Sequence, residues 1–404
     1  MLSAPPAGQP APDDGMLPSS ALVGHRDRGF SLYVHVPFCA TRCGYCDFNT
    51  YTAAELGAAP GASQQAYLDA VVAELDLAVG VLGEPAPVRT IFFGGGTPTL
   101  LPAADLAGLL AAIGERVEVV PDAEITTEAN PESVDQAYLD SLVAAGFTRL
   151  SLGMQSARPG VLAVLERRHT PGRVAQVVRQ ARAAGFGSIS LDLIYGTPGE
   201  TEDDWRASLD EVIALAPQHV SAYSLTIEDG TRLAAQVRRG ELADIDEDEQ
   251  ADRYLAAEQL LTAAGYQNYE ISNWARPGQE CRHNLAYWRG DDWWGIGPGA
   301  HSHVGGVRWW NVRYPGRYSA RLADGFSPAE AREVLTAAER HEETVMLAVR
   351  LCDGLRLAEL DDEERGRVTA LVDEGLVNVV HGVLRLTVSG RLLADSVIRR
   401  ILAL

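Results

Sequence analysis

Apolar stretches of strand length alternate with amphipathic stretches of helical period over more than half of the chain. The strand-like runs lie at residues 31–38, 90–93, 124–128, 149–154, 188–195 and 220–225, and helical patterns lie between them, as at 63–82, 133–145, 172–184 and 202–214. This alternation, with short connections, predicts a parallel sheet with helices packed outside it. Six such units predict an α/β fold, either a partial barrel or an open wound sheet. In both architectures, ligands bind at the carboxyl ends of the strands.

The unusual polar and glycine-rich stretches all fall at the carboxyl ends of the predicted strands. In chain order they are Cys39, residues 94–99 (GGGTPT), 128–131 (EANP), 153–156 (GMQS), 192–199 (DLIYGTPG) and 223–225 (YSL). Chance would scatter such stretches between both ends of the sheet. Their placement therefore predicts one ligand site at this end.

The two ends of the chain differ from this central region. Residues 1–29 are rich in Pro, Ala, Gly and Ser, lack the pattern of a signal peptide and are predicted to be a disordered tail. From residue 327, helical patterns at 329–351 and 359–374, β-like runs at 376–380 and 383–387, and a helical pattern at 389–404 predict a mostly helical, winged-helix-like module. Acidic residues throughout it favour packing or protein docking over DNA binding. The predicted domains are thus 30–265, 266–326 and 327–404.

Composition and charge narrow the class of protein. The chain has 404 residues, 46% of them hydrophobic, and a formal net charge of −21. This charge opposes binding to nucleic acid or to an anionic membrane surface, both of which need a basic face. The cysteine count is five, an odd number, and three cysteines are clustered, so a disulfide framework is not expected and a reducing compartment such as the cytoplasm is. No apolar run is long enough to cross a membrane.

The clustered cysteines carry the strongest chemical signal. Cys39, Cys43 and Cys46 have the spacing C-x3-C-x2-C directly after an apolar strand. A cubane iron–sulfur cluster that is bound only by protein needs four cysteines, so three leave one iron open to a cofactor or substrate. A zinc loop is the alternative, but no second Cys or His pair follows at a usual spacing. The pattern favours the open cluster.

Charged residues near the predicted strand ends each allow two interpretations. Glu128 and Asp192 lie within mostly apolar strands, where a carboxylate is either a hydrogen-bonded structural group or, at a barrel mouth, a partner for a ribose hydroxyl or an ammonium group. Arg167 lies in the stretch LERRHT and is either on a solvated helix face or available to pair with a cofactor carboxylate. The glycine tract at 94–96 is neither a dinucleotide fingerprint nor a P-loop.

Aromatic residues concentrate in the segment from 267 to 310, which holds six of the chain's seven tryptophans. Dense aromatics usually pack a core or a domain interface. The interleaved His283, His301 and His303 suggest the alternative of an aromatic wall beside a planar ligand such as a porphyrin, because histidine commonly binds haem iron. The composition alone favours packing.

Taken together, the motifs resemble those of the radical S-adenosylmethionine (SAM) superfamily. The resemblance is closest to the branch that contains oxygen-independent coproporphyrinogen III oxidase and the haem chaperones related to it, and it covers nearly all of residues 31–400. The motifs are YVHVPFCATRCGYCDF, FFGGGTPTLL, TTEANPES, LSLGMQS, LDLIYGTPGET and SAYSLTIEDGT. The resemblance implies a partial (β/α)6 barrel of the TIM type with a C-terminal module like that of the oxidase.

The resemblance also implies roles for individual residues. Cys39, Cys43 and Cys46 would bind a [4Fe-4S] cluster, whose open iron would take the amino and carboxylate groups of SAM. The residues expected to contact SAM, or to flank it and the cluster, are Tyr33, Tyr45, Gly95 and Glu128. The residues that match a second SAM site of the oxidase are Gly96, Thr97, Gln155, Arg167 and Asp192.

Two features distinguish the chaperones from the oxidase. The oxidase has a further cysteine two residues after the third ligand, where this chain has Phe48. The chain also carries the H-N-x-x-Y-W motif of the haem-binding chaperones, formed by His283, Asn284, Tyr287 and Trp288. Both features favour a chaperone that binds haem b, with His283 as the axial ligand, and the alternative is the oxidase.

The implied partners are haem, haem-accepting membrane and respiratory proteins and an electron donor, with a homodimer as a further expectation. Nucleic acid is not expected, and the protein would be cytoplasmic, with peripheral membrane association during delivery.

Overall fold

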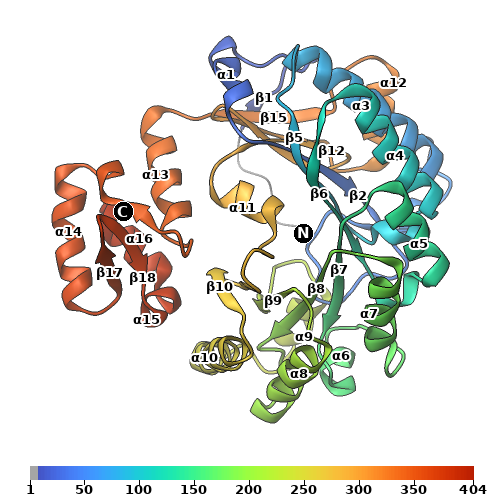
Figure 1. Ribbon diagram of the computed structural model, residues 1–404. Coiled ribbons are helices and arrows are strands. Elements are labelled where there is room, and N and C mark those ends of the chain that lie inside the picture. The colour runs from blue at the N-terminus through green and yellow to red at the C-terminus, as the bar shows by residue number, and fades with distance from the viewer. Residues whose placement is uncertain (1–7) are drawn as a thin grey trace.

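The computed structural model describes residues 8–404 and is built around one large curved sheet (Figure 1). Within the described residues, the strand order is β1-β15-β14-β13-β12-β2-β5-β6-β7-β8-β9-β11-β10. The six predicted strands form its parallel centre: β2 (Phe30–Val36), β5 (Val88–Gly95), β6 (Val119–Ala129), β7 (Arg149–Gln155), β8 (Ser188–Tyr195) and β9 (His219–Ser224). The prediction of an α/β partial barrel is confirmed.

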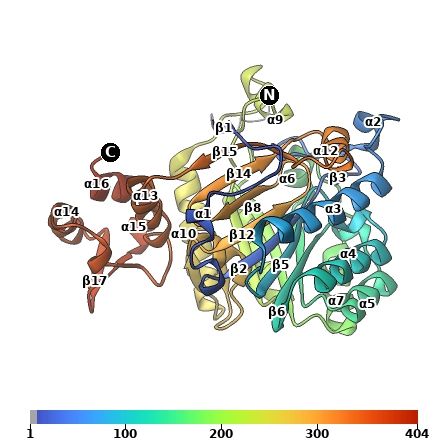
Figure 2. The ribbon, with the colours of Figure 1, turned by 90° about the horizontal axis from the view of Figure 1, so that it is seen from above.

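Helices cover the outer face of this sheet, as Figure 2 shows for α3, α4, α5 and α7. The covering helices are α3 (Gln64–Leu82), α4 (Ala103–Arg116), α5 (Gln136–Ala145), α7 (Arg173–Ala184) and α8 (Glu202–Leu215). Thr201 and Asp204 form a capping box at the start of α8, and left-handed Gly146 and Gly185 end α5 and α7, as predicted.

The segment after the six units extends the sheet at both edges. β10 (Gln267–Glu270) and β11 (Asn273–Ala275) add to β9, whereas β12 (Asp292–Ile296) pairs in parallel with β2 and continues through β13 (His301–Val304) and β14 (Val307–Asn311). Its tryptophans pack these additions, as where Trp294 meets Trp309 edge-on with ring centroids 4.8 Å apart. Most of this aromatic segment is therefore core, the simpler of the two sequence interpretations.

Helix α11 (Arg282–Trp288) connects the two edges and lies in the middle of the curved sheet (Figure 1). Its first residues sit at the amino ends of the parallel strands. The backbone N–H groups of Arg282 and His283 donate to the Glu124 carboxylate, at 3.1 and 2.9 Å. The helix thereby closes the barrel at the end opposite to the cysteines.

The prediction of a disordered tail over residues 1–29 is wrong for residues 8–29, and residues 1–7 lie outside the described part. β1 (Gln9–Pro10) pairs with β15 (Ala329–Val334), and a short helix, α1 (Ser19–Leu22), follows. The backbone N–H of Ser327 donates to the Asp13 carbonyl oxygen at 2.7 Å. A low-hydrophobicity segment becomes ordered here because a sheet edge satisfies its backbone groups.

The predicted helix over residues 329–351 is also wrong in its first part. Residues 329–334 form β15, and the helix α13 begins later (Ala337–Ala348). The sequence AEAREV favours a helix locally, but pairing with β14 on one side and β1 on the other overrides that preference.

The remaining C-terminal residues form a separate small module with its own core (Figures 1 and 2). It contains α13, β16 (Leu355–Arg356), α14 (Asp362–Asp373), β17 (Val377–Val380), β18 (Val383–Leu386), α15 (Val388–Leu392) and α16 (Ala394–Leu402). This order of helices and ribbon agrees with the prediction. The Arg391 guanidinium holds the module to the barrel through Glu258 at 2.6 Å, and the module's cysteine, Cys352, is exposed.

A buried carboxyl group joins α3 to the added strands. Glu74 is 1% exposed and accepts hydrogen bonds from Tyr318 Oη at 2.6 Å, Asn311 Nδ2 at 2.7 Å and the Gly297 backbone N–H at 2.8 Å. Burial raises the pKa of Glu74 to about 7, although these hydrogen bonds act in the opposite direction. The position of α3 against the added strands thus depends on the buried carboxyl group of Glu74.

Candidate functional site

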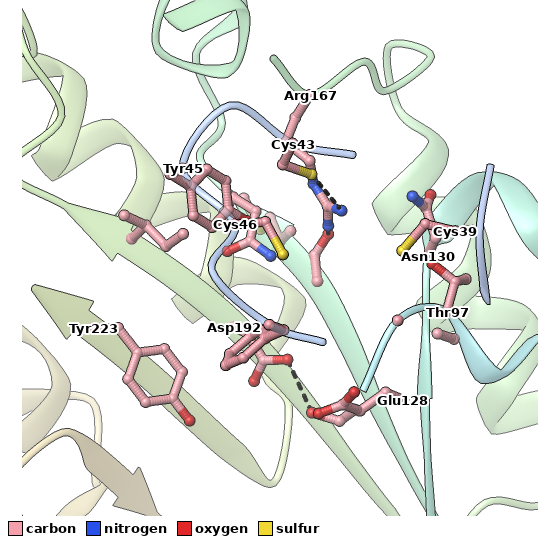
Figure 3. A pocket seen from close by; sticks show the side chains of 18 of the residues that line it. Cys39, Cys43, Tyr45, Cys46, Thr97, Glu128, Asn130, Arg167, Asp192 and Tyr223 are labelled. Carbon is pink, nitrogen blue, oxygen red and sulfur yellow. Dashed lines mark hydrogen bonds between the residues drawn. The ribbon is translucent and has the colours of Figure 1, made fainter. Parts of the chain in front are cut away.

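A cavity of about 2390 Å³ opens at the carboxyl ends of the parallel strands. This exceeds the roughly 300–1,000 Å³ of an ordinary small-molecule pocket. It is lined by the predicted residues Tyr33, Cys39, Cys43, Tyr45, Cys46, Gly95, Gly96, Thr97, Glu128, Gln155, Arg167, Asp192, His283, Asn284 and Tyr287. Figure 3 shows many of them converging from separate strands. Trp288 does not line the cavity.

The three cysteines lie on one loop that backbone hydrogen bonds hold at both ends. β3 (Phe38–Cys39) and β4 (Tyr51–Thr52) pair beside it, and the Phe38 carbonyl oxygen accepts from the Thr97 N–H at 2.8 Å. The cysteines are half-buried, free of disulfides and face the cavity (Figure 3). Burial raises the pKa of Cys46 to about 11, and a bound metal ion would favour its thiolate form. The three thiols match in number the three irons that a cubane cluster with one open iron offers to a protein.

The glycine tract brings backbone against the first cysteine. A Cβ atom on Gly96 would lie 2.5 Å from the Phe38 carbonyl oxygen and 3.1 Å from Cys39 Sγ. Gly95 has a φ of 114°, which favours glycine, and its N–H donates to Glu128 Oε2 at 3.0 Å. The glycine tract therefore places its backbone directly against the start of the cysteine loop.

We expect Gly96→Ala to reduce cluster incorporation, because the added methyl group displaces Phe38 or Cys39. Iron content per chain after anaerobic reconstitution measures this effect. Gly80→Ala is the matched control, since a Cβ atom at Gly80 meets nothing within 4 Å and neither Gly80 nor Gly96 has a positive φ. Equal iron content in the Gly96→Ala and wild-type proteins would contradict the packing argument.

Two carboxylates stand on the strands beneath the cysteines. Burial raises the pKa of Glu128 to about 8, with a smaller contribution from the charge of Asp192. Asp192 accepts from Ser151 Oγ at 2.9 Å and from Ser190 Oγ at 3.3 Å, and burial raises its pKa as well. A cationic ligand group would stabilise the ionised form of both. Both carboxyl groups line the cavity, and the ammonium interpretation stays a prediction.

Arg167 is the cation nearest to the cysteine loop. Its Nη1 donates to Cys43 Sγ at 3.6 Å and its Nη2 to the Gly153 carbonyl oxygen at 3.2 Å (Figure 3). Its buried Nε has no partner among the described residues. Gln155, at the end of the neighbouring strand, has a left-handed φ of 65°, which turns its backbone at this end of the sheet. The solvated-face interpretation of Arg167 is therefore wrong, because the guanidinium points into the site.

His283 does not have a ring nitrogen available for iron in this arrangement. Its Nδ1 lies 2.7 Å from Thr90 Oγ1 and its Nε2 lies 2.9 Å from Tyr287 Oη, and its ring stacks on Phe92. Burial lowers the pKa of His283 to about 3. The motif residues His283 and Tyr287, together with Tyr33, instead form the floor of the cavity.

The other histidines of the aromatic segment lie away from the cavity. His301 is exposed and stacks on Trp310, whereas His303 Nδ1 lies 3.1 Å from the Asp291 carbonyl oxygen. Sequence reasoning missed two other histidines, His169 and His219, which do line the cavity. The sequence did contain one signal for His219. It lies two residues before Ser221 of the predicted strand at 220–225, so both side chains are on the same face of the sheet.

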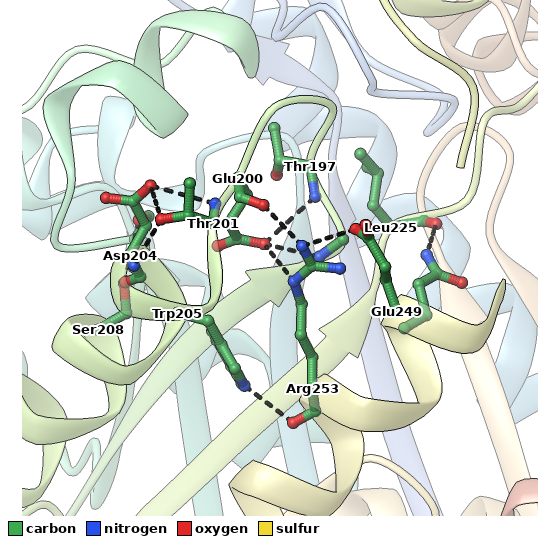
Figure 4. Close-up of polar contacts among 12 residues, drawn as sticks. Thr197, Glu200, Thr201, Asp204, Trp205, Ser208, Leu225, Glu249 and Arg253 are labelled. Atoms are coloured by element: carbon green, nitrogen blue, oxygen red, sulfur yellow. Dashed lines mark hydrogen bonds and ion pairs between the residues drawn. The ribbon is translucent and has the colours of Figure 1, made fainter. Parts of the chain in front are cut away.

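An ion-pair network outside the cavity holds the turn after β8 (Figure 4). Glu200 Oε2 accepts from the Gly196 N–H at 2.8 Å, and Arg253 Nη2, on α10 (Glu247–Ala263), donates to the Glu200 carbonyl oxygen at 2.6 Å. Trp205 Nε1 donates to the Arg253 carbonyl oxygen at 2.8 Å. The conformation of the GTPGE turn, which follows Asp192, is therefore set by α8 and α10.

Comparison with known proteins agrees with this geometry. The family model of the radical SAM superfamily matches residues 33–212. A solved structure, coproporphyrinogen III oxidase (HemN) from Escherichia coli, superposes with a TM-score of 0.81 at 25% identity, covering 96% of this chain and 94% of the oxidase. Fold and site thus define a radical SAM protein, a class whose cofactors are a [4Fe-4S] cluster and SAM.

Sequence relatives narrow the class further. Heme chaperone HemW of Mycobacterium tuberculosis is 52% identical over 373 residues, 92% of this chain and 95% of the relative. Heme chaperone HemW of Bacillus subtilis is 34% identical, covering 91% of this chain and 97% of the relative. The chain belongs to the HemW family of the radical SAM superfamily.

Proposed function

We propose that this protein is a haem chaperone that binds haem b and delivers it to haem-dependent membrane and respiratory proteins. The main support for this proposal is the 52% identity, over 92% of the chain, to a relative named as a heme chaperone. The position two residues after Cys46 supports it, because Phe48 replaces the cysteine expected in the oxidase and is 61% exposed. The size of the cavity leaves room for haem beside SAM.

We propose that the cysteine loop and the surrounding strand ends hold the two cofactors. Cys39, Cys43 and Cys46 bind the [4Fe-4S] cluster, and Glu128 accepts a hydrogen bond from the ammonium group of SAM. The other proposed SAM contacts are Tyr33, Tyr45, Gly95, Gly96, Thr97, Gln155, Arg167 and Asp192. When bound and reduced by an external electron donor, the cluster would supply the electron that radical SAM chemistry uses to cleave the SAM sulfonium. The chain's own residues orient SAM and exclude water from it.

The proposed partners follow from this role. They are haem, a membrane or respiratory protein that accepts it, an electron donor for the cluster and a second copy of this chain in a homodimer. The protein would be cytoplasmic, with peripheral membrane association during delivery. None of the helices between residues 8 and 404 combines the length and apolar character that a bilayer crossing requires. Delivery would therefore take place by peripheral contact.

Coproporphyrinogen III oxidase is the second candidate function, favoured by the match to HemN over 94% of that structure. One assay separates the two. Purified protein with a reconstituted cluster is titrated with haem while the Soret band is followed, and the same preparation is incubated with coproporphyrinogen III, SAM and a reductant. We expect stoichiometric haem binding and no decarboxylation. Efficient decarboxylation would contradict the chaperone function.

A further inference from the structure

The histidines that line the cavity differ in whether their ring nitrogens are occupied. There are three within the described residues: His169, His219 and His283. His219 lies 2.7 Å from Ser190 Oγ through Nδ1 and 2.9 Å from Tyr269 Oη through Nε2, and His283 is engaged in the same way on both sides. Both ring nitrogens of His169 are buried and have no hydrogen-bond partner between residues 8 and 404. His169 is therefore the cavity histidine with nitrogens available to a ligand.

His169 lies on a loop that is anchored on either side of it. This loop connects α6 (Pro159–Val164) to α7. Before His169, Arg167 contacts Gly153 and Cys43; after it, the Thr170 N–H donates to Glu132 Oε1 at 2.6 Å. The loop thus holds the ring at the cavity, and a metal requires only that one ring nitrogen of a neutral imidazole be free of other partners.

The chemistry around His169 suits a metalloporphyrin with carboxylate arms. Burial, and secondarily the charge of Arg167, lowers the pKa of His169 to about 4, so its imidazole is neutral at physiological pH, the form that binds iron. The neighbouring Arg168 is exposed and lines the cavity. A guanidinium pairs well with a carboxylate such as a haem propionate.

We propose that His169 is the axial ligand of the haem iron, with Arg168 paired to a propionate. This inference rests on the proposed haem-binding function and places the haem on the loop beside the cysteines. It assigns the H-N-x-x-Y-W histidine, His283, to the cavity floor. Coordination exchanges a water molecule on ferric iron for an imidazole nitrogen and transfers no electron.

The test compares His169→Ala with His283→Ala in the full-length protein with its cluster reconstituted. Haem b is titrated into each, and the absorption of the cluster-loaded protein without haem is subtracted. We expect His169→Ala to shift the Soret band and to weaken haem binding at least about tenfold. Added imidazole should restore the wild-type spectrum. His283→Ala should keep the wild-type ligand field, because that ring is not bound to iron.

A ligand swap keeps the test independent of any folding defect. His169→Met should bind haem with a spectrum and a reduction potential typical of thioether ligation, since Met ligation raises the potential. An unchanged wild-type spectrum in both His169 variants would overturn this inference and leave the chaperone function standing. Failure of the wild-type protein to bind haem would overturn the chaperone function and this inference together.

Discussion

Replacing Cys43 with alanine should abolish the [4Fe-4S] cluster. Cys43 is one of three thiols that face the cavity, and its Sγ accepts from Arg167 Nη1 at 3.6 Å. A cubane with an open iron has no spare protein ligand, so the loss of one thiolate leaves two irons uncovered. We expect iron content to fall from about four atoms per chain to less than about one, with loss of the cluster absorption. SAM binding, followed by equilibrium dialysis, should be lost with it.

Cys352 provides the matched control for this experiment. It is the exposed cysteine of the C-terminal module and lies outside the cavity. Cys352→Ala should therefore keep the wild-type iron content and SAM binding. A Cys43→Ala protein that retained about four irons and wild-type cluster absorption would contradict the ligand assignment.

Replacing Glu74 with alanine should destabilise the fold by about 3–5 kcal/mol. The change leaves three buried donors without an acceptor: Tyr318 Oη, Asn311 Nδ2 and the Gly297 N–H. It also creates a cavity between α3 and the strands added beside β2. The midpoint of urea unfolding, at constant slope, measures the effect. Asp69→Ala on the exposed face of the same helix should change stability by no more than about 0.5 kcal/mol.

The contribution of Glu74 should also depend on pH. Its folded-state pKa of about 7 lies above the ordinary value of 4.5, so its contribution to stability is complete below pH 4.5 and is lost as the pH rises through 7. The stability advantage of the wild type over Glu74→Gln should therefore shrink between pH 5 and pH 8, by on the order of 1–3 kcal/mol. A difference that is constant with pH would show that Glu74 is ionised throughout.

The core of the fold was predictable because its signals are local. Each of the six parallel strands is a short apolar run, and each ends in Gly or polar residues that a ligand site requires. The same local reasoning failed at residues 8–29 and 329–334. Residues 9–10 become a strand by pairing with β15, as where Gln9 pairs with Arg332, more than 300 residues later in the chain, and β15 is also held on its other edge by β14. Local composition does not contain such pairings.

In the candidate site, too, local motifs were predictable and contacts between distant residues were not. Its cysteines and strand-end residues were identified correctly as cavity residues because their spacing within short motifs reflects the site directly. The sequence did not predict that the ring nitrogens of His283 are engaged in hydrogen bonds. The partner of its Nδ1 is Thr90, which lies 193 residues earlier in the chain. His169 drew no attention in the sequence, where LERRHT resembles an ordinary basic surface.

The sequence by itself determined the class of protein: an α/β barrel of the radical SAM class, with three cysteines on one loop and candidate ligand residues at the strand ends. Tertiary structure decided which polar groups are free to act. A motif specifies which side chains are present, but whether a ring nitrogen can bind a ligand depends on the hydrogen-bond partners that distant strands place against it. Within residues 8–404, those partners occupy both ring nitrogens of His283 and leave the two buried ring nitrogens of His169 without a hydrogen bond.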